Sequence, residues 1–183
     1  MFYIVSGLER SGTSLMMQML HAGGAPVAFD DSRPADEHNP RGYFELYGGK
    51  IARRLSENPM LITQYEGKVI KVTAYGLQFL PLSQQAYNII FMQRNYNEIL
   101  RSLNKMSPDI DIEEDRSLFE GIEQKALNLI AERKDMDMIT IDHKALITYP
   151  EECAPPVARF LGLELDIAKM VEVVDPTLWR NRG

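Results

Sequence analysis

Short apolar runs alternate with segments of helical periodicity along the chain. Runs rich in Val, Ile, Tyr, Phe and Met predict buried strands at residues 2–5, 68–72, 87–92 and 136–141. Helices are predicted for residues 15–20, 50–58, 97–105, 112–133, 150–161 and 166–174. This alternation predicts an α/β domain with a parallel sheet and right-handed crossovers, in which a ligand binds beyond the carboxyl ends of the strands.

Residues 29–49 interrupt this pattern. The stretch is rich in Asp, Pro, Gly and Asn, and irregular loops of this length are uncommon in a compact domain unless they serve a function. We therefore expect residues 29–49, together with the segment at 106–108, to shape a substrate pocket.

Composition restricts the class of protein. With 183 residues, 45% of them hydrophobic and 25% charged, the chain suits one α/β domain spanning residues 1–183. The net charge of -6 argues against a general nucleic-acid binder, and no apolar stretch is long enough to cross a membrane. No basic start precedes the apolar residues 1–5, and the one cysteine, Cys153, is consistent with a reducing compartment. We expect a cytoplasmic protein whose partners include neither nucleic acid nor membrane; its oligomeric state stays open.

The first strand leads into a glycine-spaced loop. Gly7 and Gly12 keep the G-x-x-x-x-G spacing of a phosphate-binding loop, but Thr13-Ser14 replaces the Lys-Ser/Thr that normally follows. Glycine lets the backbone approach a ligand closely, and the amides of residues 11–14 would open a helix whose N-terminus attracts an anion. The loop also carries Arg10. It therefore predicts a phosphate site that lacks the lysine of a nucleotide hydrolase or kinase.

A second anion site is predicted after the strand at 87–92. Arg94 ends this run, and Ser102 follows eight positions later in the next predicted helix. An arginine presents a planar fork of donors to a phosphate, and a serine hydroxyl adds a neutral donor. The alternatives are a surface arginine with a solvated serine, and a first loop in which Ser11 or Thr13 only caps the helix. The pair of sites favours a ligand with anionic groups at two ends, held without a metal ion.

These motifs resemble those of the sulfotransferases that use 3′-phosphoadenosine 5′-phosphosulfate (PAPS). Residues 9–14 are similar to the family's 5′-phosphosulfate loop, Pro-Lys/Arg-Ser-Gly-Thr-Ser/Thr, and Arg94 with Ser102 is similar to its 3′-phosphate element, Arg-Asn/Asp-Pro followed by a serine. The similarity covers nearly the whole chain; the weaker segments are 69–73 with 80–81, 39–45, 142–146, 150–151 and 160–163. The chain departs from the family pattern at Glu9, Tyr96, His143 and Thr73, the last of which stands where the catalytic histidine is expected.

The resemblance implies a three-layer P-loop-type domain, with a central, mostly parallel sheet flanked by helices. It implies transfer of a sulfuryl group from PAPS to a hydroxyl or amine of a small molecule or glycan, which leaves 3′-phosphoadenosine 5′-phosphate (PAP) and requires no metal. The residues implied for cofactor binding are Arg10, Ser11, Gly12, Thr13, Ser14, Arg94, Ser102 and His143. Among them, His143 is expected near the adenine. Arg10 would steady the leaving 5′-phosphate, and Lys71, at a strand end, would contact the bridging or sulfuryl oxygens.

The catalytic base cannot be carried over from the family because Thr73 replaces the histidine. The candidates in the long loop are Glu45, Asp30, Asp31 and His38. We favour Glu45, since the aromatic residues before it would raise its pKa into a useful range. The alternative is that Glu45 only caps the next helix or binds a basic group of the substrate. The predicted catalytic set is Glu45, Lys71 and Arg10.

Two other functions stay open. A metal-dependent small-molecule or nucleoside kinase would use Asp142, at the end of a strand, as a metal-binding acid, although Thr13 and Arg94 argue against it. A non-catalytic nucleotide-binding module would keep the cofactor site without a base. Whether Arg180 and Arg182 reach the cofactor is open as well. The sulfotransferase interpretation requires that the pocket at Arg94 is neither closed off nor filled by an acidic side chain.

Overall fold

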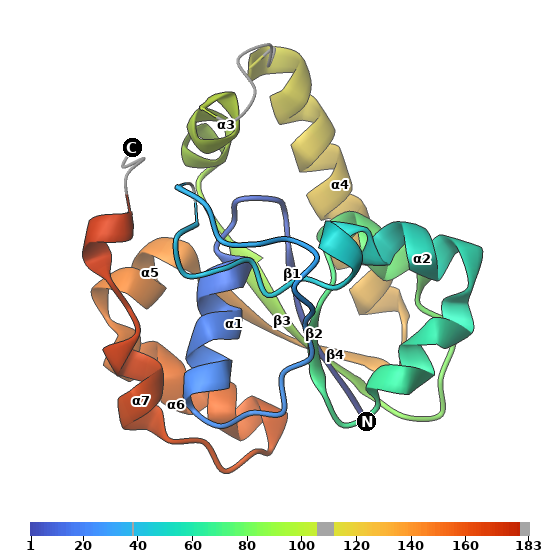
Figure 1. Ribbon diagram of the computed structural model, residues 1–183. Helices are drawn as coiled ribbons and strands as arrows, with labels where there is room; N and C mark the ends of the chain where they lie inside the picture. Colours follow the sequence, from blue (N-terminus) through green and yellow to red (C-terminus); the bar gives the residue numbers. More distant parts are fainter. Residues whose placement is uncertain (38, 106–111, 180–183) are drawn as a thin grey trace.

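The sheet is parallel throughout. The computed structural model describes residues 1–37, 39–105 and 112–179 (Figure 1). The strands β1 (Phe2–Gly7), β2 (Val69–Lys71), β3 (Tyr87–Gln93) and β4 (Met136–Asp142) form one four-stranded sheet in the order β2-β1-β3-β4. In this register Val5 pairs with Lys71 and with Ile90, and the carboxyl ends of the strands meet at one edge.

Helices cover both faces of the sheet. Successive strand residues point to opposite faces, so that Ile4 packs into one core and Val5 into the other. On the Val5 side lie α1 (Thr13–Ala22), α5 (His143–Thr148), α6 (Pro150–Leu161) and α7 (Ile167–Glu172). On the Ile4 side lie α2 (Ile51–Glu57), α4 (Ile112–Glu132) and the 3-10 segments η2 (Pro59–Tyr65) and η3 (Ala74–Phe79).

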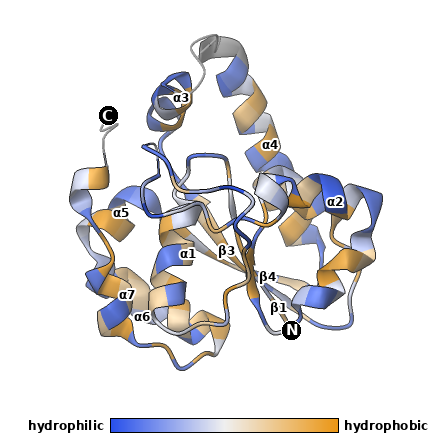
Figure 2. Cartoon of the chain, viewed as in Figure 1, coloured by the Kyte–Doolittle hydropathy of each residue, from blue (hydrophilic) through white to orange (hydrophobic). Residues whose placement is uncertain are grey.

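The remaining elements lie around the carboxyl edge of the sheet. They are η1 (Tyr47–Gly49), α3 (Tyr96–Asn104) and η4 (Pro176–Leu178). Figure 2 shows apolar residues along the strands, whereas the outer helices combine apolar and polar faces. Within the described part of the chain, no helix is long and apolar enough to cross a membrane.

The predicted fold class is confirmed: a parallel sheet lies between two helical layers. Each predicted strand and helix is present, with ends shifted by a few residues. The helix α5 and the 3-10 segments are not predicted from the sequence. The helix α5 has only six residues and starts at a polar stretch, where Asp142 caps it by accepting a hydrogen bond from the amide of Ala145.

Candidate functional site

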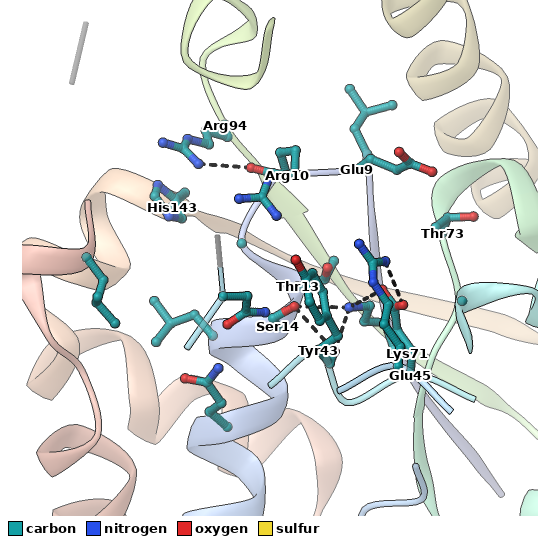
Figure 3. A pocket seen from close by; sticks show the side chains of 18 of the residues that line it. Glu9, Arg10, Thr13, Ser14, Tyr43, Glu45, Lys71, Thr73, Arg94 and His143 are labelled. Atoms are coloured by element: carbon teal, nitrogen blue, oxygen red, sulfur yellow. Dashed lines mark hydrogen bonds and ion pairs between the residues drawn. The ribbon is translucent and has the colours of Figure 1, made fainter. Parts of the chain in front are cut away.

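A cavity of about 420 Å³ lies over the carboxyl ends of β1, β2 and β3 (Figure 3). Its walls come from the glycine-spaced loop, the long loop, α3, the start of α5 and the segment before residue 180, that is, residues 173–179. All the residues predicted to bind cofactor line this cavity or touch a residue that does; they are Arg10, Ser11, Gly12, Thr13, Ser14, Arg94, Ser102 and His143. The predicted catalytic residues Glu45 and Lys71 line it as well.

The glycine-spaced loop has the backbone of an anion cradle. Gly7 and Gly12 have φ values of 142 and 104, a region that glycine tolerates. Gly12 is the N-cap of α1 and makes no side-chain capping bond, so the sequence alternative of a Ser11 or Thr13 cap is not what the helix uses. The amide of Ser11 donates to the Leu8 carbonyl. The amides of Thr13 and Ser14 lie in the first turn of α1, where the helix offers them no carbonyl, so they can bind an anion.

The two predicted phosphate motifs interlock. The Nε atom of Arg10 donates to Oγ of Ser102 at 2.9 Å, and Nη1 of Arg94 donates to the carbonyl oxygen of Arg10 at 3.0 Å. Ser102 is buried in α3. Arg10 was expected at the 5′-phosphate, but its side chain lies beside Arg94 and Ser102, the residues expected at the 3′-phosphate.

Arg94 has an acidic neighbour. Its Nε atom lies 2.8 Å from Oε2 of Glu98, and the two side chains are 9% and 7% exposed. Oε2 of Glu98 also accepts from Nε1 of Trp179 at 2.9 Å. Burial first, and then Arg10, lower the pKa of Arg94, while Glu98 acts in the opposite direction. Arg94 lines the cavity and Glu98 does not, so the pocket is not closed off. The second part of the condition set from the sequence is not fully met, because an acidic side chain already pairs with the guanidinium of Arg94.

His143 is buried against the glycine-spaced loop. A Cβ atom on Gly12 would lie 2.5 Å from Cδ2 of His143, so the imidazole occupies the space that the glycine leaves. Burial, and then the charge of Arg94, lower the pKa of His143 to about 3. Its Nδ1 atom makes no hydrogen bond with any described residue, and its ring meets Trp179 edge-on at 6.3 Å between centroids. The side chain is therefore a neutral imidazole with an unused polar atom.

Lys71 and Glu45 form the other pole of the site. The Nζ atom of Lys71 lies 2.8 Å from Oε1 of Glu45 and donates to Oγ of Ser14 at 3.0 Å and to the carbonyl oxygen of Tyr43 at 2.7 Å. Nη1 of Arg33 donates to Oε2 of Glu45 at 2.9 Å. Burial lowers the pKa of Lys71, against the opposing charge of Glu45. The carboxylate of Glu45 thus lies between the cations Lys71 and Arg33, and not in the aromatic surroundings expected from the sequence.

The backbone of the long loop, residues 29–49, is strained at two positions beside Glu45. Phe44 and Tyr47 have φ values of 54 and 56, which residues with a Cβ atom rarely adopt. The turn at Phe44 sends its ring outward onto Phe29 and His21, with centroids 4.7 and 5.6 Å away. Its two neighbours in the chain therefore face the cavity (Figure 3).

Several predicted residues do not join the site. Asp30 accepts hydrogen bonds from the amides of Ser32 and Tyr47 and so holds the loop itself. Asp31 does not line the cavity, and Asp142 caps α5. His38, residues 106–108, Arg180 and Arg182 lie outside the described residues. Over the described ranges, no group of three or more His, Cys, Asp and Glu residues is placed to hold a metal ion.

Four residues of the site were not assigned a role from the sequence: Arg33, Tyr43, Glu98 and Trp179. Glu98 follows Arg94 by four positions in a helix, a spacing that could have indicated the pair. The other three act through contacts between distant segments. No local signal marks Arg33, whose guanidinium lies 3.6 Å from the centre of the Tyr43 ring.

Comparison with solved structures supports the fold. The sulfotransferase domain from the Synechococcus PCC 7002 olefin synthase matches with a TM-score of 0.56 and 16% identity, over 100% of this chain and 88% of that domain. The sulfotransferase domain from the curacin biosynthetic pathway matches with a TM-score of 0.58 and 15% identity, over 92% of this chain and 76% of that one. No protein-family model and no curated protein matches the sequence. At these identities the likeness shows a shared fold.

Proposed function

We propose that the protein is a sulfotransferase that uses PAPS and acts in the cytoplasm, without a metal ion, on a hydroxyl or amine of a small molecule or glycan. One observation carries the proposal. A single cavity joins the loop amides and Lys71 to a separate cluster of Arg94, Arg10 and Ser102. Anion-binding groups at two poles suit a nucleotide that is phosphorylated at both ends.

The residues present fit such a nucleotide. A cavity of about 420 Å³ is within the usual size of small-molecule sites. Ser11 Oγ and His143 Nδ1 are buried polar atoms without a hydrogen bond to any described residue, and they lie in or against the loop that would receive the nucleotide. A side chain on Gly12 would clash with His143 and intrude on the cradle.

The roles of the residues follow from these positions. The amides that open α1 would hold the 5′ end together with Nζ of Lys71, which would exchange one of its three present acceptors for the ligand. Arg94 and Ser102 would hold the 3′-phosphate. His143 would contact the adenine. When bound, PAPS would supply an activated sulfuryl group. The chain's own contribution is to position the ligand and to place fixed positive charge where negative charge develops.

Glu45 is the proposed base for the acceptor. It lines the cavity with a side chain that is 13% exposed, and it lies beside Lys71, which marks the predicted sulfuryl end. Its ion pairs with Lys71 and Arg33 hold the carboxylate in place. An acceptor hydroxyl or amine that reaches Glu45 would have to share that carboxylate with the two cations. Thr73 also lines the cavity but has no basic group.

Thermal unfolding with added nucleotides tests the proposal. PAP without magnesium should raise the melting temperature by about 5–10 °C at roughly a hundred times its Kd, and ATP with magnesium should raise it less. Equal shifts, or a shift that requires magnesium, would favour a kinase instead. Tight binding of PAP without sulfation of any member of a broad acceptor panel would identify a non-catalytic binding module.

A further inference from the structure

Arg10 belongs to one predicted phosphate site by sequence and contacts the other in space. It lies in the glycine-spaced loop, yet its Nε atom bonds to Ser102, which is 92 positions away in α3. In Figure 3 the Arg10 side chain lies near Arg94, away from Lys71 and Glu45. The φ of 64 at Arg10 is a left-handed conformation that a residue with a Cβ atom keeps only when its surroundings fix it. The loop backbone therefore directs this guanidinium toward α3.

The charge balance at α3 calls for a second cation. Arg94 and Glu98 form a buried ion pair, so much of the charge of Arg94 is already compensated. A phosphate group carries about 1.5 to 2 negative charges at neutral pH. Arg10 lies close enough to Arg94 to lower its pKa, after the larger effect of burial. It lowers the pKa of Lys71 in the same way, so the hydrogen bond to Ser102 is what assigns the Arg10 side chain to α3. An anion between the two guanidinium groups would relieve their repulsion.

We propose that Arg10 binds the 3′-phosphate together with Arg94 and Ser102, and that it sets the preference for nucleotides that carry this phosphate. The inference rests on the proposed function, because it presupposes an adenosine nucleotide in the cavity. It leaves the 5′ end to Lys71 and to the amides that open α1. Arg10 is then a residue that determines cofactor specificity, rather than a group that acts on the leaving 5′-phosphate.

Calorimetric titration with PAP and with adenosine 5′-monophosphate (AMP) tests the assignment, since AMP lacks the 3′-phosphate. Arg10→Met should weaken PAP about tenfold or more and leave AMP within about twofold. Lys71→Met should weaken both ligands by similar factors. Arg53→Met, the same change at an arginine that is 76% exposed on α2, should alter neither.

Two further variants keep the test decisive. Arg10→Lys keeps the charge without the fork and should give a smaller loss, again for PAP alone. The double variant Arg10→Met with Ser102→Ala should lose less binding free energy for PAP than the two single variants lose together, because both groups bind one phosphate. Melting temperatures without ligand show that each variant is folded.

The outcomes separate the two claims. If the wild-type protein binds PAP, and Arg10→Met loses PAP and AMP equally or loses neither, the assignment of Arg10 is overturned while the proposed function stands. If the wild-type protein does not bind PAP, the proposed function fails and the assignment fails with it.

Discussion

At the scale of single residues, His143 connects the candidate site to the stability of the fold. The ring is 6% exposed, lies against Gly12 and is held neutral by burial and by Arg94. Protonation would place a second positive charge beside Arg94 in a buried place. The burial that leaves Nδ1 of His143 without a hydrogen bond to a described residue therefore also makes the fold sensitive to acid.

The pH dependence of unfolding should show this sensitivity. The pKa of His143 is about 3 in the folded chain, below its ordinary value near 6.5, so the unfolded chain binds the proton first as the pH falls. Stability should decrease between about pH 6.5 and 3, and by pH 5 this residue should cost about 2 kcal/mol. Denaturant unfolding at pH 7 and pH 5 measures the loss. His143→Gln should lose about 2 kcal/mol less than the wild-type protein.

The matched control is His21→Gln, at the exposed histidine in the last turn of α1. Its loss between pH 7 and pH 5 is the reference for removing a histidine that is not buried. An equal loss in His143→Gln would contradict the buried neutral imidazole.

At the scale of secondary-structure elements, the sequence predicts the features that depend on residues close together in the chain. The run at 87–92 predicts β3 because a strand buried on both faces has no polar alternation. The glycine spacing and Arg94 with Ser102 likewise lie within single strand-to-helix units. The pairing of Arg33 with Glu45, and the outward turn of Phe44, depend on a loop whose shape comes from packing against α1 and β2. Such contacts leave no periodic trace in the sequence.

The long loop gives a test at this scale through its glycines. A Cβ atom on Gly49, with φ +84, would lie 2.7 Å from Oε2 of Glu45, whereas one on Gly24, with φ +90, would meet nothing within 4 Å. Gly24→Ala should therefore cost about 1–2 kcal/mol for backbone strain alone. Gly49→Ala should cost more in denaturant unfolding and should also displace Glu45. Similar losses in the two variants would show that the carboxylate moves aside freely.

At the scale of the whole molecule, distant segments close the cavity. Arg41 in the long loop donates to the carbonyl of Val173 and pairs with Asp175 at 3.2 Å. Trp179 bonds to Glu98 on α3. The segment before residue 180 thus bridges two walls of the site, through an ion pair that is 40% and 30% exposed and therefore weak. Nothing near this segment in the chain indicates these partners, so the sequence alone does not predict the contacts.

Because of this arrangement, the fluorescence of Trp179 should report ligand binding. Trp179 is the only tryptophan in the sequence, and its indole lies between Glu98 and His143 at the cavity wall. A phosphate that reaches Arg94 competes with Glu98 for the guanidinium, so the environment of the indole should change. We expect a saturable change in tryptophan emission on titration with PAP, with the Kd found by calorimetry, and a smaller change with AMP. Arg41→Met should loosen the segment and speed both association and dissociation in stopped-flow measurements. Binding of PAP without any change in emission would place the nucleotide away from Trp179 and from the Arg94 pole of the cavity.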